Sequence, residues 1–456
     1  MKMQLAEIAK AVNAENDIER WKTLEVSSVS FDSREVTEGA LFVPLMGERD
    51  GHTFVDSAAK NGAVATFWCR DHTDISTDLP VIVVKDTLQA LQDLSRYYLM
   101  KINPRVVAVT GSNGKTTTKD MIAALLATQF NVTKTQDNFN NEIGVPVTIL
   151  SMEPTTELLV VEMGMDRPGQ LEFLSKLAQP DLAVITMIGE AHIEFFGTRD
   201  KIADAKMEIT SGLKADGVFI YNGDEPLLRE RAEAISQYQR TFGREAINDF
   251  YPTDIVATPT ATSFKTNRWP DETFEIPLIG EYNVNNALAA LAVAATYQIR
   301  PENMHQALKD FDITENRTEW MKGARGEQIL SDVYNSNPTA VKEVLSAFIQ
   351  VPAKRKRIAV LGDMLELGTD ADAMHAELAD YLHPDQIQSL YLIGTHMKAL
   401  ENKLITIYPS DSLHYFPTTD LSALIMQLDK EVTEDDLVLL KGSHGIHLEE
   451  ALNALK

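Results

Sequence analysis

The feature that most constrains the fold is a glycine-containing loop that follows a short apolar run. Val106–Val109 is mostly β-branched, which predicts a buried strand, and the next residues read Thr110-Gly111-Ser112-Asn113-Gly114-Lys115-Thr116-Thr117. Glycines let the backbone curl so that successive N–H groups point at one anion. Lys115 can then reach the outer phosphates of a nucleotide, and the Thr116 hydroxyl can ligate Mg²⁺. The pattern therefore predicts a phosphate-binding loop.

This loop departs at one position from the motif G-x-x-x-x-G-K-[ST], because Val109 stands where the first glycine is usual. Apolar residues at helical spacing between Met121 and Leu126 predict a helix that starts near Thr116. A strand before the loop and a helix after it favour nucleotide binding. The alternative is an ordinary strand, turn and helix that holds no ligand.

Length, charge and cysteine content exclude several classes of protein. A chain of 456 residues is expected to form about three domains. The formal net charge of −25 argues against a nucleic-acid-binding protein, which needs a basic face, but not against a small nucleotide ligand. Cys69 is the only cysteine, so no intrachain disulfide can form. We see no signal-peptide pattern and no apolar run of about 18 residues, and therefore expect a cytoplasmic protein without a transmembrane segment.

The alternation of strands and helices predicts an α/β protein with three domains. Residues 1–86 read as a small N-terminal α/β domain. Residues 87–314 begin with a connecting helix, expected at 87–102, and continue as a parallel sheet of the kind found in P-loop ATPases. Residues 315–456 read as a Rossmann-like domain without G-x-G-x-x-G, so a dinucleotide is not indicated.

Two polar residues follow predicted strands of the central domain. Glu162 ends the apolar run from Leu158, and His192 follows the run 182–186. Parallel sheets place ligand-binding groups at the carboxyl ends of their strands. We therefore interpret both residues as groups around Mg²⁺, although histidine is a soft ligand and could act through water or on a second metal ion. Each could instead be a solvated loop residue.

Lys206 lies on the apolar side of a predicted helix. Thr198 can cap this helix, and Ile202 lies on the same side as Lys206. A lysine is unusual there. The alternative is a lysine that covers apolar surface with its stem and keeps its ammonium in water.

Three further groups have a functional and a structural interpretation. Asn283 and Asn286 share a helical face and could bind an adenine or ribose edge, or cap the helix. Arg317 could bring a charge to a phosphate when a domain closes, or pair with Glu319. The turn Asp32-Ser33-Arg34 offers a hydroxyl and a guanidinium to a phosphate, but its residues favour a solvated turn.

Together these stretches resemble the Mur ligase family, the ATP-dependent amide-forming enzymes of peptidoglycan synthesis, over essentially the whole chain. Four further stretches are similar to the family member that adds a dipeptide. They are Asn140–Pro146, Asp332–Pro338, Gly362-Asp363-Met364-Leu365-Glu366-Leu367-Gly368 and Lys441-Gly442-Ser443. The third stretch is the most specific. His444 departs from the pattern, since the family is expected to have arginine there, and we assign it no role.

The resemblance implies a ligase that joins D-alanyl-D-alanine to UDP-N-acetylmuramoyl-tripeptide through an acyl phosphate and a tetrahedral intermediate. It implies an N-terminal domain for the UDP end, a central ATPase domain, a closing C-terminal domain, and hinges near residues 86 and 314. ATP and Mg²⁺ are the implied cofactors, both substrates are small molecules, and a monomer is expected.

The resemblance also implies roles for individual residues. Catalytic roles fall to Lys115, His192, Lys206 and Arg317. The nucleotide would be bound by the loop Thr110–Thr117 with Asn283, Asn286, Arg317 and Asp332. The metal environment would comprise Thr116, Glu162, His192 and Lys206, the last as the carbamate that several of these ligases carry. The UDP-sugar substrate would contact Asp32, Ser33, Arg34, Asn138 and Asn141.

Two competing interpretations remain at this point. One is a sibling ligase that adds a single amino acid, or a folate polyglutamylating enzyme. The other is a non-catalytic nucleotide-binding partner of a cell-wall complex, which should have lost some of the polar residues that this chain retains: Lys115, Glu162, His192 and Lys206. The sequence leaves open whether the third residue of the tripeptide is lysine or diaminopimelate.

Overall fold

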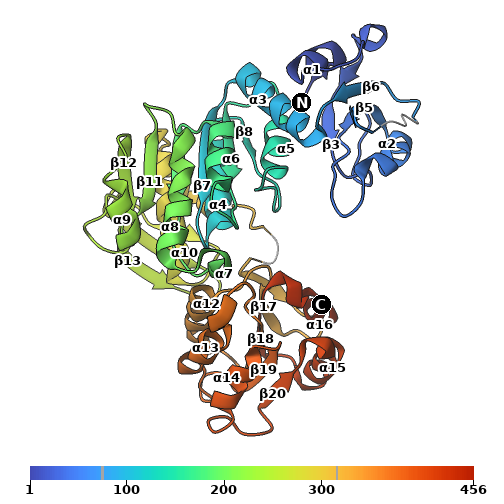
Figure 1. Ribbon diagram of the computed structural model, residues 1–456. Helices are drawn as coiled ribbons and strands as arrows, with labels where there is room; N and C mark the ends of the chain where they lie inside the picture. The colour runs from blue at the N-terminus through green and yellow to red at the C-terminus, as the bar shows by residue number, and fades with distance from the viewer. Residues whose placement is uncertain (73–76, 315–316) are drawn as a thin grey trace. The chain divides into compact units, whose positions relative to one another are not determined.

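The computed structural model describes residues 1–72, 77–314 and 317–456 (Figure 1). These residues form two compact units. The first comprises Met1–Thr110, Gln129–Val184 and Glu208–Phe219, and the second comprises Gly111–Thr128, Ile185–Met207 and Ile220–Lys456. The predicted start of the C-terminal domain at residue 315 lies outside the described residues.

The N-terminal part of the first unit is a four-stranded parallel sheet. Its strands occur in chain order: β3 (Ser28–Ser30), β4 (Ala40–Phe42), β5 (Ala63–Cys69) and β6 (Val81–Val84). The core on this sheet includes Phe42 and Trp68. Helix α3 (Thr87–Ile102) follows with the predicted bounds. Asp86 caps its start, and Asn103 ends it in a left-handed conformation before Pro104.

A six-stranded sheet carries the phosphate loop. Its strand order is β12-β11-β10-β7-β9-β8. The bounds are β7 (Arg105–Thr110), β8 (Val132–Lys134), β9 (Leu158–Glu162), β10 (Leu182–Ile185), β11 (Val218–Asn222) and β12 (Tyr238–Phe242). β9 pairs in parallel with both β7 and β8. The β-branched residues of β7 and β9 are fully buried, as expected of strands that are covered on both faces.

Two helices of the second unit pack closely behind the loop. α4 (Lys115–Ala127) starts at the loop lysine, and α10 (Glu281–Thr296) packs against it. Most residues of α10 between Val284 and Ala294 are buried, and many are alanines, whose small side chains allow a close approach. α7 (Ile193–Phe196) and α8 (Arg199–Met207) carry or flank the other predicted site residues.

The C-terminal part of the second unit is a second α/β sheet of the predicted Rossmann-like kind. Its order is β16-β17-β21-β18-β19-β20. The bounds are β16 (Glu319–Lys322), β17 (Gln328–Asp332), β18 (Arg357–Gly362), β19 (Ser389–Ile393), β20 (Leu413–Phe416) and β21 (Leu437–Lys441). Only β16 runs antiparallel to its neighbour. α12 (Pro338–Gln350), α13 (Ala371–Ala376) and α14 (Met397–Leu404) cover one face, and α15 (Leu421–Glu431) and α16 (Glu449–Leu455) cover the other (Figure 1).

Smaller elements complete the fold. An antiparallel meander of β13 (Pro252–Ala257), β14 (Thr262–Thr266) and β15 (Phe274–Ile276) lies in the second unit and was not predicted. The other elements are β1 (Met3–Gln4), α1 (Leu5–Ala11), β2 (Glu25–Val26), α2 (Val55–Lys60), α5 (Gly144–Leu150), α6 (Gln170–Ala178), α9 (Pro226–Ala232) and α11 (Pro301–Lys309). Within the described ranges, no helix is long and apolar enough to cross a membrane.

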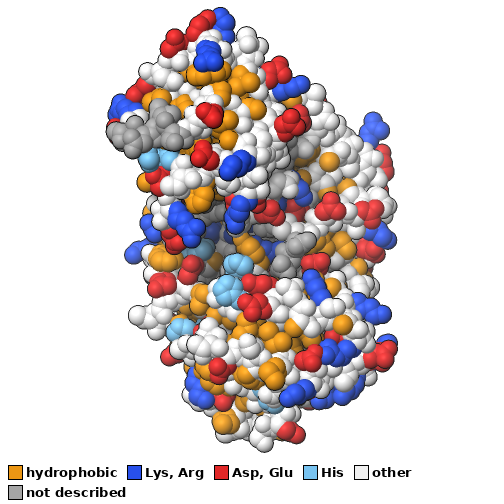
Figure 2. Space-filling model, turned by 90° about the vertical axis from the view of Figure 1, so that its right-hand side faces the viewer, with side chains coloured by type: hydrophobic (Ala, Val, Ile, Leu, Met, Phe, Trp, Pro, Cys, Tyr) orange, Lys and Arg blue, Asp and Glu red, His pale blue; other side chains and the backbone are white. Residues whose placement is uncertain are grey.

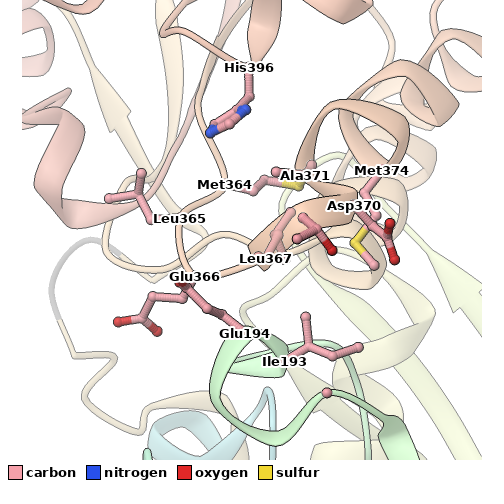
Figure 3. Close-up of a pocket in the computed structure, with 13 residues that line it drawn as sticks. Ile193, Glu194, Met364, Leu365, Glu366, Leu367, Asp370, Ala371, Met374 and His396 are labelled. Carbon is pink, nitrogen blue, oxygen red and sulfur yellow. The ribbon is translucent and has the colours of Figure 1, made fainter.

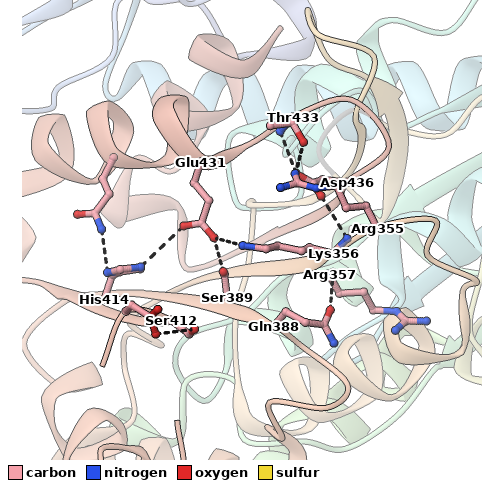
Figure 4. Close-up of polar contacts among 12 residues, drawn as sticks. Arg355, Lys356, Arg357, Gln388, Ser389, Ser412, His414, Glu431, Thr433 and Asp436 are labelled. Carbon is pink, nitrogen blue, oxygen red and sulfur yellow. Dashed lines mark hydrogen bonds and ion pairs between the residues drawn. The ribbon is translucent and has the colours of Figure 1, made fainter. Parts of the chain in front are cut away.

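The amino ends of the C-terminal strands are held by a polar network around Glu431 (Figure 4). Its carboxylate accepts hydrogen bonds from Ser389, from Lys356 Nζ at 3.1 Å and from the Tyr391 hydroxyl at 2.5 Å. Burial, followed by the bond to Glu431, raises the pKa of Tyr391, so the phenol stays protonated and donates. Ligands of such sheets bind at the opposite, carboxyl edge, so this network stabilises the fold and does not form a site.

Surface charge agrees with the composition. On the face drawn in Figure 2, described basic side chains lie interspersed with acidic ones. Neither sign of charge covers this face alone.

Candidate functional site

Two glycines shape the phosphate loop. Gly111 has a φ of +154°, and a Cβ built there would lie 1.8 Å from Thr186 Oγ1. Gly114 has a φ of +78°, and its Cβ would lie 2.3 Å from Asn286 Oδ1. Side chains are therefore excluded at both positions by close neighbours, and at Gly114 also by the left-handed backbone. Thr186 further fixes the loop by donating its hydroxyl to the carbonyl of Asn113 at 2.5 Å.

The loop lysine and the next threonine begin helix α4. Lys115 Nζ donates to the carbonyl of Gly111 at 2.8 Å, so its ammonium lies over the curl of the loop. Thr116 is buried, and Thr117 is partly exposed. The helix N-terminus at Lys115 adds partial positive charge to the same place. The curled loop, the lysine and the helix N-terminus thus lie together in an arrangement that suits an anion.

Asn283 and Asn286 support the loop from helix α10. Asn286 Oδ1 accepts from the Thr118 hydroxyl at 3.3 Å, and Asn286 Nδ2 donates to Asn283 Oδ1 at 3.0 Å. Asn283 Nδ2 donates in turn to the carbonyl of Ile279 at 2.8 Å. Both residues lie inside the helix, which begins after Gly280, so the interpretation of these residues as helix caps is wrong.

Lys206 is buried without a counter-ion. Its side chain, on α8, is 2% exposed. No hydrogen bond or ion pair of its ammonium occurs among the described residues, so the alternative of a solvated ammonium is wrong. Burial, and second the nearby charge of Lys115, lowers the pKa of Lys206 well below its ordinary value. A neutral amine is favoured here, and a neutral amine is nucleophilic.

Glu162 offers an unused carboxylate oxygen in the first unit. It pairs in register with Val109, so it lies at the strand end from which the phosphate loop departs. Oε1 accepts from Asn140 Nδ2 at 2.9 Å. The other oxygen, Oε2, is buried and has no hydrogen-bond partner among the described residues. A buried carboxylate oxygen without a donor is unfavourable unless a cation meets it, so Glu162 fits a Mg²⁺ ligand or a ligand of its bound water.

His192 lies at a strained turn before α7 and contacts a C-terminal loop. Its φ is +63°, which is unusual for a residue with a side chain. Nδ1 lies 2.5 Å from Glu366 Oε2. The hydrogen bond to His192 lowers the pKa of Glu366 from its ordinary value.

Arg317 and Asp332 have partners that the sequence did not reveal. The Arg317 guanidinium lies 4.0 Å from the ring centroid of Tyr334, which is a cation–π contact. Asp332, at the end of β17, accepts from Lys441 Nζ at 2.6 Å. This explains the lysine of the Lys441-Gly442-Ser443 stretch, because an opposite charge offsets the cost of burying a lysine charge.

The predicted substrate residues come together within the first unit. The Phe31 and Phe139 rings are 5.9 Å apart, which brings the turn at Asp32 next to the loop that holds Asn138 and Asn141. Asn138 is exposed, and Asn141 Oδ1 accepts from the amides of Ile143 and Gly144 at 3.1 and 2.9 Å, so it also shapes the start of α5.

The turn itself is held by its own residues. Two contacts from Arg34, a side-chain and then a backbone hydrogen bond, lower the pKa of Asp32 to about 2. Ser33 is buried, and the Arg34 side chain is 86% exposed. This geometry agrees with a solvated turn and leaves the arginine available to an anionic ligand.

The second unit contains several contacts that sequence reasoning missed. Asn113 and Asn337 exchange two hydrogen bonds. Glu190 accepts from the Thr339 hydroxyl at 2.7 Å. The only local signal was Asn337-Pro338, which is typical of a helix start, and Asn337 does cap α12. Nothing in that signal indicates a partner in the phosphate loop.

A cluster of Asp50, His52 and His72 has ligand types that suit a metal ion. His52 Nδ1 lies 2.7 Å from Asp50 Oδ1, and His52 Nε2 accepts the amide of Cys69 at 3.1 Å. His72 Nε2 lies 2.5 Å from the second Asp50 oxygen. Both nitrogens of His52 are thus engaged in hydrogen bonds, so a metal ion could bind His52 only by displacing one of these partners.

Three family models match the chain. They are the Mur ligase family, catalytic domain, at residues 25–99, the Mur ligase middle domain at 109–294, and the Mur ligase, glutamate ligase domain at 316–444. The second match contains the phosphate loop, Glu162, Lys206 and the asparagine pair.

Relatives and solved structures agree with these matches. The UDP-N-acetylmuramoyl-tripeptide–D-alanyl-D-alanine ligase of Bacillus subtilis is 40% identical over 100% of this chain and 98% of its own. A MurF crystal structure from Acinetobacter baumannii has a TM-score of 0.87 at 28% identity, covering 100% and 99% of the two chains. The MurF ligase of Thermotoga maritima in complex with ADP has a TM-score of 0.79 at 30% identity, covering 94% and 97%. The chain belongs to the Mur ligase family.

Proposed function

We propose that this protein is an ATP-dependent ligase that joins D-alanyl-D-alanine to UDP-N-acetylmuramoyl-tripeptide, which forms the pentapeptide precursor of peptidoglycan. The observation that carries this proposal is the full-length similarity, at 40% identity, to a relative of that name. The phosphate loop supports it, because its anion site lies beside the buried amine of Lys206.

The reaction must activate a carboxylate, which is a poor electrophile. The terminal carboxylate of the tripeptide attacks the γ-phosphorus of ATP, so that an acyl phosphate forms and ADP leaves. The amine of D-alanyl-D-alanine then attacks the acyl carbon and loses a proton. The tetrahedral intermediate collapses to the amide and expels inorganic phosphate. The contribution of the protein is mainly positioning and charge neutralisation.

The second unit supplies the nucleotide groups in this proposal. Loop amides from Gly111 to Thr117 would bind the phosphates, and Lys115 would exchange its bond to the Gly111 carbonyl for a phosphate oxygen. Asn283, Asn286 and Asp332 would hold the adenosine end, directly or through the loop that the asparagines support. Arg317, held over the Tyr334 ring, would offer its guanidinium to the phosphates.

Mg²⁺, when bound, would neutralise the developing charge on the transferred phosphate. The residues proposed for its environment are Thr116, Glu162, His192 and Lys206. The free Oε2 of Glu162 suits a hard cation. An unmodified Lys206 does not suit a hard cation. Its lowered pKa favours reaction with CO₂, in which the amine forms an N–C bond, releases a proton and becomes an anionic carbamate.

The first unit would hold the UDP-sugar. The turn Asp32–Arg34 and the loop of Asn138 and Asn141 are neighbours there, with the Arg34 guanidinium exposed. Hinges near residues 86 and 314 would allow a closure that excludes water from the acyl phosphate. We further propose that the enzyme works as a monomer in the cytoplasm.

The alternatives receive less support. Structural neighbours that act on a single amino acid or on folate are 17% and 15% identical and show a shared fold alone. The proposal is tested by phosphate release from purified protein given ATP, Mg²⁺, UDP-N-acetylmuramoyl-tripeptide and D-alanyl-D-alanine. We expect release only when all four are present. Release with a single amino acid in place of the dipeptide would favour a sibling ligase, and no release with any acceptor would favour a non-catalytic protein.

A further inference from the structure

No step of the proposed reaction uses the stretch Gly362–Gly368, which resembles the family member that adds a dipeptide. It forms the loop after β18, at the carboxyl edge of the C-terminal sheet. Glu366 within it has a φ of +61°, and His192 has a φ of +63°. A left-handed backbone conformation costs free energy in a residue other than glycine, and it occurs where surrounding contacts enforce it. The two residues contact each other.

Two hydrogen bonds join Glu366 to the turn that carries His192 and Glu194. His192 Nδ1 lies 2.5 Å from Glu366 Oε2, and the Glu194 amide donates to the Glu366 carbonyl at 3.0 Å. A carboxylate accepts, so Nδ1 carries the hydrogen. The other ring nitrogen, Nε2, makes no hydrogen bond among the described residues. In the neutral ring, Nε2 therefore has a free lone pair.

The loop that presents Glu366 is firmly held. The Met364 amide donates to His375 Nε2 at 2.9 Å, and the Leu365 amide donates to Ser443 Oγ at 2.9 Å. Met364 and His375 are fully buried. The Ser443 bond gives a role to the third residue of the Lys441-Gly442-Ser443 stretch. The backbone that leads to Glu366 is thereby held in place.

A cavity of about 660 Å³ adjoins this contact (Figure 3). Glu366 and Glu194 line it together with Asp370, whose side chain makes no contact with His192. The carboxylate of Glu366 is 44% exposed, so its contact with His192 is not required to satisfy a buried charge. This favours a functional reason for the pairing over a purely structural one.

We propose that Glu366 is a positioning residue that fixes His192 in the Nδ1–H tautomer and presents its Nε2 lone pair to the divalent cation. The inference rests on the proposed function, because it assumes that His192 acts in the metal environment. A carboxylate that orients a metal-binding histidine is worth about 10–100-fold in metal affinity in other sites. The strained, anchored loop is then explained as the support of that carboxylate.

Glu366→Ala and Glu366→Gln test the proposal, with Asp370→Asn as the matched control from the same cavity wall. In protein labelled with ¹⁵N-histidine, and without metal, His192 should show Nδ1–H in wild type and Asp370→Asn. We expect Glu366→Ala to shift it towards the Nε2–H form. Glu366→Gln keeps an acceptor without the charge and should shift it less. The signal of His192 is identified as the one that is missing from the spectrum of the His192→Gln variant.

Metal binding is the second readout. Titration with Mn²⁺, followed by electron paramagnetic resonance, should show affinity about 10–100-fold weaker in Glu366→Ala and unchanged in Asp370→Asn. An unchanged His192 tautomer in Glu366→Ala would overturn the proposal, and so would Mn²⁺ affinity within about twofold of wild type. Both readouts are independent of ligase activity, so a failure of the proposed function would appear separately, as wild-type protein without turnover.

Discussion

Asn113 in the phosphate loop and Asn337 at the start of α12 exchange two hydrogen bonds. Asn113 Nδ2 donates to Asn337 Oδ1 at 3.2 Å, and Asn337 Nδ2 donates to Asn113 Oδ1 at 2.7 Å. Asn337 Oδ1 also accepts the Ala340 amide at 3.0 Å, as the cap of α12. One side chain thus joins the start of a helix in the C-terminal sheet domain to the loop expected to bind phosphate.

The amide pair can be measured by a double-mutant cycle in thermal unfolding. Asn337→Ala should cost about 1–2 kcal/mol, because it removes both the cap and the pair. Asn337→Ser keeps a capping oxygen and should cost less. When Asn337→Ala is combined with Asn113→Ala, we expect a coupling free energy of at least about 0.5 kcal/mol between the two sites. Strictly additive losses would show that the two amides do not stabilise each other.

Gly114→Ala should weaken ADP binding by about tenfold or more and destabilise the protein by more than about 1 kcal/mol. A Cβ there meets Asn286 Oδ1 at 2.3 Å on a left-handed backbone. Gly169→Ala is the matched control, because its φ is +86° and nothing lies within 4 Å of the added Cβ. Calorimetric titration with ADP measures the ADP affinity of the Gly114→Ala and Gly169→Ala variants. Equal losses in both variants would mean that the contact with Asn286 is unimportant.

Lys206 predicts a specific dependence of stability on pH in CO₂-free buffer. Its folded-state pKa is lowered, chiefly by burial, from an ordinary value of 10.5. Between the folded and the ordinary pKa, the unfolded chain binds more protons, so the free energy of unfolding rises with pH across that interval. Lys206→Met removes the titrating amine. The free energy of unfolding of this variant should rise less steeply with pH and should exceed that of wild type at neutral pH. Parallel curves of the free energy of unfolding against pH, measured by urea unfolding, would contradict the lowered pKa of Lys206.

The carbamate of Lys206 is a separate prediction. With ¹³C-bicarbonate, wild type should show a carbamate carbon resonance that Lys206→Ala lacks. Lys206→Ala should lose about 100-fold or more in kcat, because the carbamate proposed to help hold Mg²⁺ is lost. Short carboxylic acids should restore part of this activity. A bare amine under CO₂-saturated conditions, together with no rescue by carboxylic acids, would count against the carbamate.

Local patterns in the sequence predicted much of the fold. The bounds of α3 could be predicted because Asp86 caps its start and Asn103-Pro104 ends it. The strands β9 and β18 could be predicted because short, continuous apolar runs are typical of buried strands. The phosphate loop could be predicted because glycine spacing and a following helix are both local.

Contacts between distant residues could not be predicted in this way. Asn113 and Asn337 are 224 positions apart, and neither carries a local signal for the other. The sequence suggested that Asn283 and Asn286 bind adenine or ribose, but it did not indicate that their amides are also hydrogen-bonded to each other and to Thr118 of α4. Glu366 belonged to a recognised stretch, but its contact with His192 depends on how the C-terminal loop packs.

The measurement that tests the central claim most directly is a competition assay read by mass spectrometry. The protein is given ATP, Mg²⁺, UDP-N-acetylmuramoyl-tripeptide and an equimolar mixture of D-alanyl-D-alanine with free D- and L-amino acids. We predict one major product, the tripeptide extended by two alanines, formed with one ADP for each amide, and no product from Lys115→Ala. A product extended by a single amino acid, or none from wild type, would contradict the proposed function.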